Sequence, residues 1–157
     1  MCIRDRPLII RYPNQKNRGK QTFALTELVD IFPTLCEISG IKVPDYFQGT
    51  SLVPLIENPD RSWKKAAFSQ FHRRPKVSAD GGRYMGYSLN TEASHYIEWY
   101  QWDHKTGTKG DFVTAELYDR KNDPSETVNI AGDVAQKERV EKLSEQLKGG
   151  WKAALPN

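Results

Sequence analysis

The second half of the chain contains two neighbouring runs that indicate its fold most clearly: Arg83-Tyr-Met-Gly-Tyr-Ser-Leu-Asn-Thr91 and His95-Tyr-Ile-Glu-Trp-Tyr-Gln-Trp102. Both runs are rich in aromatic residues, and the polar residues 90–94 between them favour a turn, so the pair predicts two antiparallel strands. In the second run, the odd and the even positions both carry aromatic rings. Because side chains alternate between the faces of a strand, this pattern is typical of a sheet covered on one face and partly shielded on the other.

Two more strands and a helix complete this predicted body. Residues 66–71 and 115–119 are the other strand candidates, and Asp80-Gly-Gly82 separates the first of them from the hairpin. The last segment, Asp133 to Ala154, has an apolar stripe at helical spacing, although its two adjacent glycines weaken a helix by about 1 kcal/mol each. We therefore expect a small α+β subdomain, a four-stranded antiparallel sheet with a C-terminal helix.

The first part of the chain has a different pattern. Residues 7–12 are almost continuously apolar, which predicts a strand buried on both faces of a parallel sheet, and this chain supplies no partner strand upstream. A helix follows, with Asp30 expected as its N-cap, Pro33 in its first turn and Gly40 as its left-handed C-cap. We interpret these elements as the last strand and helix of a larger α/β domain.

A linker rich in proline and glycine separates the two bodies. Residues 43–55 predict an irregular loop, and the boundary is expected between Glu57 and Trp63. Residues 1–6, which include Cys2, have the look of a non-native artefact and are excluded from the fold. The predicted organisation is thus 1–6 artefact, 7–57 the end of a catalytic α/β domain, and 58–157 a C-terminal subdomain.

Composition sets further bounds. The 157 residues are 38% hydrophobic and 27% charged, with a net charge of +3, which describes a polar globular chain. No apolar run approaches the ~20 residues of a membrane helix, and we expect neither a nucleic-acid nor a membrane partner. Basic residues concentrate between Arg61 and Lys76, a pattern typical of a solvated loop and alternatively of a site for anionic ligands such as sulfated sugars. Cys36 is expected to be a small buried hydrophobe.

Several short motifs, in order, resemble the C-terminal end of a sulfatase, in the alkaline-phosphatase-like superfamily and closest to its iduronate-2-sulfatase branch. The matching stretches are Leu28-Val-Asp-Ile-Phe-Pro-Thr-Leu35, Gly49-Thr-Ser-Leu-Val-Pro-Leu55, Met85-Gly-Tyr-Ser-Leu89, Glu116-Leu-Tyr-Asp119 with Asp123-Pro124, and Glu126-Thr-Val-Asn129. Each motif alone is weak, but their order along the chain makes the resemblance strong.

The resemblance implies a sulfuric ester hydrolase with a formylglycine nucleophile, made from the Cys of Cys-x-Pro-x-Arg, and a calcium ion bound by oxygen ligands. Cys36 continues as Glu-Ile-Ser-Gly and does not match that motif. We therefore assign no catalytic residue and no metal ligand to this chain. It is expected to be a fragment that is inactive alone, while calcium and formylglycine belong to the parent enzyme.

The resemblance also implies where this end of a sulfatase approaches substrate. The segment after the first strand approaches the pocket mouth in the iduronate-2-sulfatase branch, which makes Gln70, His72 and Arg73 candidate substrate-binding residues. An arginine fork suits a uronate carboxylate or a second sulfate. Phe71 and His72 depart from the family pattern, so the resemblance does not identify the sugar substrate. The acidic residues from Glu116 to Glu126 are interpreted as turn-forming rather than catalytic.

Three functional hypotheses follow. The first is the C-terminal part of a secreted or periplasmic sulfatase acting on sulfated carbohydrate, a glycosaminoglycan or another sulfated polysaccharide, with the missing N-terminal catalytic region of the same chain as its partner. The second is a stand-alone module that binds anionic glycans through the basic cluster. The third is a fragment of a phosphonate or phosphodiester hydrolase of the same superfamily.

Overall fold

The computed structural model describes residues 7–74 and 80–156, so the expectations for residues 1–6 and for Lys76 lie outside the described residues. The chain divides into two compact units, residues 1–62 and 63–157. Within the described ranges, no helix is both long and apolar enough to cross a membrane. Whether these units correspond to the predicted catalytic-domain and subdomain segments stays a prediction.

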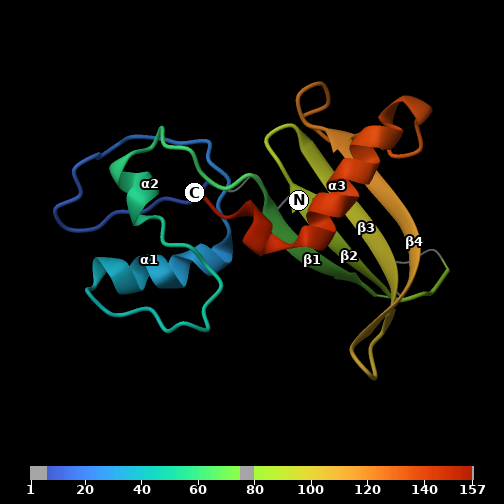
Figure 1. Ribbon diagram of the computed structural model, residues 1–157, viewed down its shortest axis with the longest axis horizontal. Coiled ribbons are helices and arrows are strands. Elements are labelled where there is room, and N and C mark those ends of the chain that lie inside the picture. Colours follow the sequence, from blue (N-terminus) through green and yellow to red (C-terminus); the bar gives the residue numbers. More distant parts are fainter. Residues whose placement is uncertain (1–6, 75–79, 157) are drawn as a thin grey trace. The chain divides into compact units, whose positions relative to one another are not determined.

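The second unit is built on a four-stranded antiparallel sheet in the order β1-β2-β3-β4 (Figure 1). The strands are β1 (Ala67–Arg73), β2 (Tyr84–Asn90), β3 (Ser94–Asp103) and β4 (Thr108–Asp119). This confirms the predicted meander. Two strands are longer than expected: β1 includes His72 and Arg73, and β4 begins seven residues before Ala115. These extensions pair with neighbouring strands, which local propensity does not reveal.

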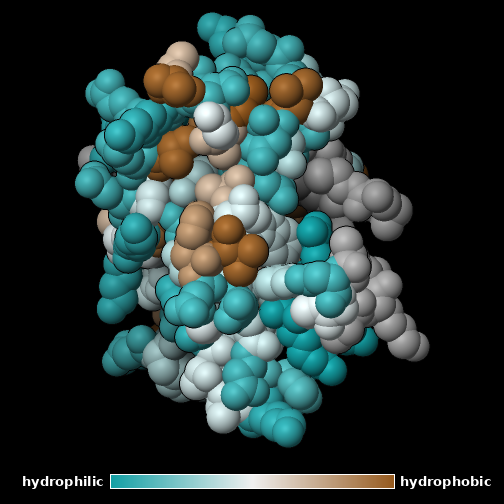
Figure 2. Space-filling model, turned by 90° about the vertical axis from the view of Figure 1, so that its right-hand side faces the viewer, coloured by the Kyte–Doolittle hydropathy of each residue, from teal (hydrophilic) through white to brown (hydrophobic). Residues whose placement is uncertain are grey.

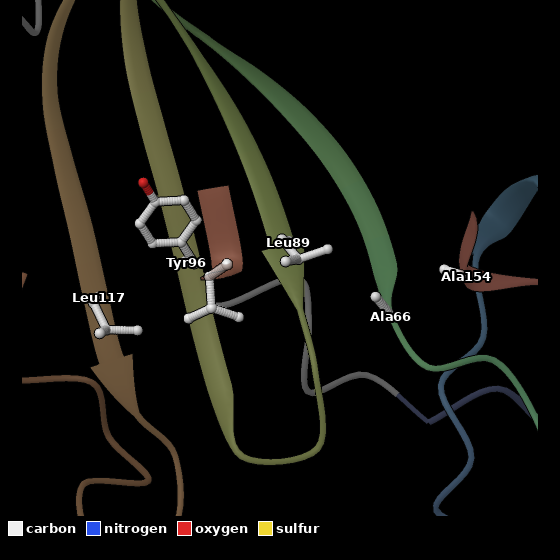
Figure 3. Packing of buried hydrophobic residues seen from close by; sticks show 6 residues of the cluster. Ala66, Leu89, Tyr96, Leu117 and Ala154 are labelled. Atoms are coloured by element: carbon white, nitrogen blue, oxygen red, sulfur yellow. The ribbon is translucent and has the colours of Figure 1, made fainter. Parts of the chain in front are cut away.

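One face of the sheet, called the helix face, packs against α3 (Lys137–Gly149). Its centre is formed by Leu89, Tyr96 and Leu117 from three adjacent strands, all at most 2% exposed, and by Leu143 of α3. Figure 3 shows the side chains of the three strand residues gathered on the same side of the sheet. Their burial, about 1.5–3 kcal/mol for each large side chain, is the main source of stability of this unit.

The predicted terminal helix is divided into three pieces. A 3-10 turn (Val134–Gln136) precedes α3, and a second one (Trp151–Ala154) follows it. Gly150 ends α3 with φ at 73°, a left-handed conformation that favours glycine over residues with a Cβ atom. The glycine pair therefore ends the regular helix, and the chain beyond it still packs, since Ala154 is 2% exposed.

The acidic motif after β4 forms a turn, as the sequence indicated. Asp123 accepts hydrogen bonds from the backbone N–H groups of Thr127 (2.7 Å) and Val128 (2.9 Å). Asn129 accepts from the N–H of Leu117 (2.9 Å) and returns the chain to the edge of β4. These carboxylate and amide oxygens satisfy backbone donors, a structural role that competes with secondary structure locally.

The first unit holds two helices, α1 (Ile31–Ile38) and α2 (Val53–Glu57). Asp30 is the N-cap residue of α1, as predicted, and Gly40 follows the helix with φ at 69°. Asp30 is fully buried and its carboxylate reaches other backbone groups: Oδ2 accepts from the N–H of Glu27 (2.9 Å) and Oδ1 from the N–H of Thr50 (2.8 Å). It therefore ties the helix start to the segment before α2.

Residues 7–12 form no regular secondary structure and Ile9 is 86% exposed, and all strand pairing among the described residues lies within β1–β4. Because the partner strands were expected outside this chain, the strand at residues 7–12 stays a prediction. One expectation for the first unit is wrong: residues 53–55, expected as the end of a loop, lie in the helix α2. Pro54 lies at the second helical position, where its missing N–H leaves no hydrogen bond unmade.

Replacement of Asp30 by alanine leaves two backbone N–H groups without their carboxylate acceptor. We expect Asp30→Ala to destabilise the first unit by about 2–4 kcal/mol, because unsatisfied buried donors are costly. Amide hydrogen exchange at Glu27 and Thr50 measures the loss of protection. Asp45→Ala, at an exposed aspartate of the same unit, is the matched control and should leave exchange unchanged; equal effects of the two changes would contradict the assigned role of Asp30.

Candidate functional site

The three predicted substrate-binding residues lie on both faces of β1. Gln70 and His72 pair with Tyr87 and Met85 of β2 in the same register as Phe68 with Leu89, which places them on the helix face. Arg73 is one residue further and belongs to the other face, called here the opposite face. The structure therefore does not bring the three side chains together.

Arg73 lies flat against an aromatic ring on the opposite face. Its guanidinium carbon is 4.4 Å from the centroid of the Trp99 ring, which is a cation–π stack. Arg73 is exposed, and among the described residues it makes no ion pair with a carboxylate. The stack fixes the plane of the guanidinium and leaves the N–H groups at its edge available, which suits a planar or tetrahedral oxyanion.

Trp99 is itself held by hydrogen bonding and by a glycine. Its Nε1–H donates to Oε1 of Glu116 (2.9 Å), and the second oxygen of Glu116 accepts from the Tyr118 hydroxyl (2.9 Å). Gly86 lies between the two strands that carry Arg73 and Trp99, and a Cβ atom there would come within 2.8 Å of the indole. Glycine at this position therefore lets the ring cross β2 and meet the arginine.

A second polar group on the opposite face links β2, β3 and the turn after β4. His95 Nε2 is 2.9 Å from Ser88 Oγ, and His95 Nδ1 is 2.9 Å from Glu126 Oε2. This order of hydroxyl, imidazole and carboxylate is that of a nucleophilic triad. Ser88, however, is 8% exposed in the middle of β2, where backbone N–H groups pair within the sheet and form no oxyanion hole. The arrangement instead anchors the turn that contains Glu126.

Residues of the helix face provide little for an anion. Gln70 is exposed across from Tyr87, and the Nε2 atom of His72 is buried without a hydrogen-bond partner among the described residues. The basic cluster from Arg61 to Lys76 is not one solvated loop, because Lys64 is only 7% exposed and Arg73 belongs to a strand. Of the predicted site residues, Arg73 alone combines exposure with a fixed orientation.

A buried carboxylate lies on the helix face, at Glu98. Its oxygens accept hydrogen bonds from the hydroxyls of Tyr96 (3.0 Å), Tyr100 (2.5 Å) and Ser144 of α3 (2.6 Å). Burial opposes ionisation of Glu98, but these hydrogen bonds outweigh it and lower the pKa of the carboxyl. Because the folded pKa is depressed, this contribution to stability is present above the unfolded pKa and is lost as the pH falls through the folded value.

The sequence did not reveal the side chains that accompany Arg73 on the opposite face or form the second polar group there, namely Trp99, Glu116, His95 and Glu126. The alternation of β3 gave a usable signal, because it places His95 and Trp99 on one face. Glu126 gave none, since its contact with His95 joins residues 31 positions apart and depends on the course of the turn.

Two half-buried tyrosines are predicted to titrate late at alkaline pH. Burial and the hydrogen bond to Glu98 raise the pKa of Tyr100 to about 12, and burial and the hydrogen bond to Glu116 raise the pKa of Tyr118 to about 12. A raised pKa stabilises the fold below about pH 10, and this contribution is lost as the pH rises through about 12. At about pH 11, we therefore expect less phenolate absorbance from the folded chain than from the chain in denaturant. Equal phenolate absorbance of the folded and the denatured chain would contradict the assigned contacts. Tyr100→Phe removes one of the two tyrosines with a raised pKa and should therefore reduce the difference in absorbance between the two states.

Comparison with known proteins gives the geometry a context. The family model described as N-sulphoglucosamine sulphohydrolase, C-terminal, matches residues 3–152. The N-acetylglucosamine-6-O-sulfatase of Bacteroides thetaiotaomicron is 34% identical over 149 residues, which cover 90% of this chain and 25% of that protein. The chain thus spans about a quarter of the length of this curated relative.

Solved structures share the fold. The structure of BT4656 in complex with its substrate D-glucosamine-2-N,6-O-disulfate aligns with a TM-score of 0.73 and 31% identity, over 92% of this chain and 27% of that one. The phosphonate monoester hydrolase of Agrobacterium radiobacter aligns with a TM-score of 0.62 and 27% identity, over 83% of this chain and 26% of that one. Because the family model covers nearly all of the sequence, the chain belongs to the N-sulphoglucosamine sulphohydrolase C-terminal family.

Proposed function

We propose that this chain is the C-terminal part of a longer sulfuric ester hydrolase that acts on sulfated carbohydrate. The family match over residues 3–152 carries the proposal. The N-acetylglucosamine-6-O-sulfatase relative and the BT4656 complex are named for sulfated amino sugars, and further relatives are named arylsulfatase K. The chain's own role is to support and complete the substrate site, whereas the nucleophile lies in the remainder of the parent enzyme. Alone, the chain does not hydrolyse sulfate esters.

Exposed apolar side chains in the first unit support a large partner from the same enzyme. Leu28 and Val29, in the 3-10 turn before α1, are 79% and 54% exposed. Leu35 of α1 is 57% exposed, and Ile9 of the apolar opening segment is 86% exposed. Exposed hydrophobic surface of this kind marks an interaction site. The partner we propose is the N-terminal catalytic region, whose sheet would also give residues 7–12 the strand partners that this chain does not supply.

Arg73 is the residue of this chain that we assign to substrate. Trp99 orients its exposed guanidinium, which makes no ion pair with a carboxylate of the described residues. A fork of this kind binds a sulfate or a uronate carboxylate through paired, charge-assisted hydrogen bonds. Gln70 and His72 lie on the helix face, so they would reach the same ligand only from the other side of the strand. We therefore retain Arg73 alone as the substrate contact.

Finer assignments rest on sequence resemblance. An iduronate-2-sulfatase-like specificity, a calcium ion, a formylglycine nucleophile and a periplasmic or secreted location are proposed for the parent enzyme. The described residues do not fit a metal site, because no three His, Cys, Asp or Glu side chains gather there. We place the calcium ligands and the nucleophile in the rest of the parent enzyme.

One alternative has an observation in its favour. The phosphonate monoester hydrolase that shares this fold at 27% identity makes a phosphonate or phosphodiester hydrolase the second candidate. The two candidates differ in the ester that they hydrolyse, a sulfate ester in the first and a phosphonate or phosphate ester in the second. A stand-alone glycan-binding module is less well supported, because the basic cluster does not form one exposed surface.

The test begins with the genomic sequence that precedes this chain. An in-frame Cys-x-Pro-x-Arg, or its serine counterpart, several hundred residues upstream supports the sulfatase. The whole protein is then expressed and assayed for release of inorganic sulfate from sulfated saccharides and for cleavage of phosphonate monoesters. Sulfate release is the expected outcome; phosphonate cleavage without sulfate release would select the second candidate.

Within the whole enzyme, Arg73→Ala should lower kcat/KM for the sulfated saccharide by about 10- to 100-fold, because a charge-assisted contact contributes about 1.5–3 kcal/mol. Arg73→Lys should recover only part of this loss, since an ammonium keeps the charge but not the fork. Arg74→Ala, which removes the same charge from the next residue, is the matched control. If Arg74→Ala lowered kcat/KM as much as Arg73→Ala, the loss would reflect the overall charge of this segment and not a contact between Arg73 and the substrate.

A further inference from the structure

A shallow groove of about 460 Å³ lies on the helix face, between α3 and strands β3 and β4. Its floor consists of the Tyr96, Tyr100 and Phe112 rings, and its rim of the α3 residues Glu141, Ser144, Glu145 and Lys148. All of these residues belong to the second unit. Ligand sites in proteins have this size and combine apolar walls with a few polar groups. The groove is on the other side of the sheet from Arg73.

A β-bulge forms one wall of the groove. The register between β3 and β4 shifts after Trp99, so that Tyr100 pairs with Phe112 and Val113 is passed over. Without the shift, alternation would turn Phe112 to the opposite face, because Ala115 already lies on the helix face across from Glu98. With it, the Phe112 and Tyr100 rings meet edge to face at 5.7 Å. Bulges that re-aim a side chain are often found beside functional sites.

The charge of the groove is negative at its base. Glu98 is 3% exposed, and its hydrogen bonds come from neutral hydroxyls, with no cation within ion-pair distance among the described residues. Lys148 lies near enough to favour the anionic form but does not pair with it. Glu141 and Glu145, one helical turn apart, add two carboxylates at the rim. An ionised buried group without a paired cation favours a cationic ligand.

The chain itself already places an ammonium on this aromatic surface. Lys109 Nζ lies over the Tyr100 ring at 4.1 Å and over the Tyr87 ring at 5.7 Å. Phe112 beside them is 55% exposed, so part of the aromatic wall stays accessible. Figure 2 views the side on which β4 lies in Figure 1 and shows small hydrophobic patches within a hydrophilic surface there. Such a wall binds cations through the negative faces of the rings.

From these observations we propose that the groove between α3 and β3–β4 binds an organic ammonium ligand of the amino-sugar class. The ammonium group lies toward Glu98 and the Glu141 and Glu145 carboxylates, and the apolar face of the sugar ring packs on Tyr100 and Phe112. Ser144 and Lys148 face the hydroxyls. A bare metal ion is a poorer match, since the described residues contain no cluster of three metal-ligating side chains. The site is independent of Arg73 and of the proposed hydrolase.

Titration of the full 157-residue chain with glucosamine tests the proposal, followed by backbone amide NMR shifts. We expect saturable shifts at Ser144, Lys148 and Tyr100, with a dissociation constant of about 1–10 mM, as for a small ligand in a shallow site. Glucose, which lacks the ammonium, and glucosamine N-sulfate, whose nitrogen is anionic, should both bind at least about tenfold more weakly. Equal binding of glucose, or no saturable shifts with glucosamine, would overturn the assignment.

Variants with matched controls locate the site. Glu141→Gln and Glu145→Gln should each weaken glucosamine binding about threefold, and Phe112→Ala about fivefold. Glu138→Gln on the same helix and Val113→Ala at the bulge lie outside the groove lining and should leave binding unchanged. Lys109→Met removes the chain's own ammonium from Tyr100 and should strengthen binding about threefold. Equal weakening by Glu138→Gln and Glu141→Gln, or weaker binding after Lys109→Met, would refute the proposed geometry.

Discussion

The alternation of side chains along β3 is the constraint on which the second unit depends. Tyr96, 2% exposed, enters the core beside α3, and its neighbours Ile97 and Trp99 turn to the opposite face. A shift of one residue in pairing would exchange these sets and place the buried rings in solvent. Because α3 covers only one face, the fold separates two chemical surfaces: an arginine stacked on Trp99 on one, and an anionic aromatic groove on the other.

Carboxylates with hydroxyl, indole or backbone donors give both units their internal order. Glu98 gathers three hydroxyls, Glu116 holds Trp99 and Tyr118, and Asp30 joins two backbone segments. Buried polar groups are stable only when they are satisfied, so each carboxylate fixes the orientation of the groups around it. On the opposite face, this ordering extends to the Trp99 ring and through it to the guanidinium of Arg73, the group that we propose as the contact to an anionic substrate.

Much of the architecture could be predicted from local pattern, and much of the site could not. The four strands, the N-cap position of Asp30 and the turn around Asp123 follow from residue type and spacing. The start of the helix at residues 53–57 was missed because residues 43–55 are rich in proline and glycine, although a proline is tolerated in the first turn of a helix. The grouping of Gln70, His72 and Arg73 was made along the sequence, whereas the extension of β1 divides them between two faces.

Local sequence pattern is sufficient to predict the family and the pairing order of the strands, since motif order, two-residue alternation and turn residues are local properties. Which side chains meet depends on how the strands and α3 pack together. The β-bulge that turns Phe112 toward Tyr100, the helix that brings Ser144 to Glu98, and the glycine that allows Trp99 to reach Arg73 all depend on contacts between separate strands or between a strand and α3. Packing sets these contacts, because residues far apart in sequence become neighbours only when the shared core is formed.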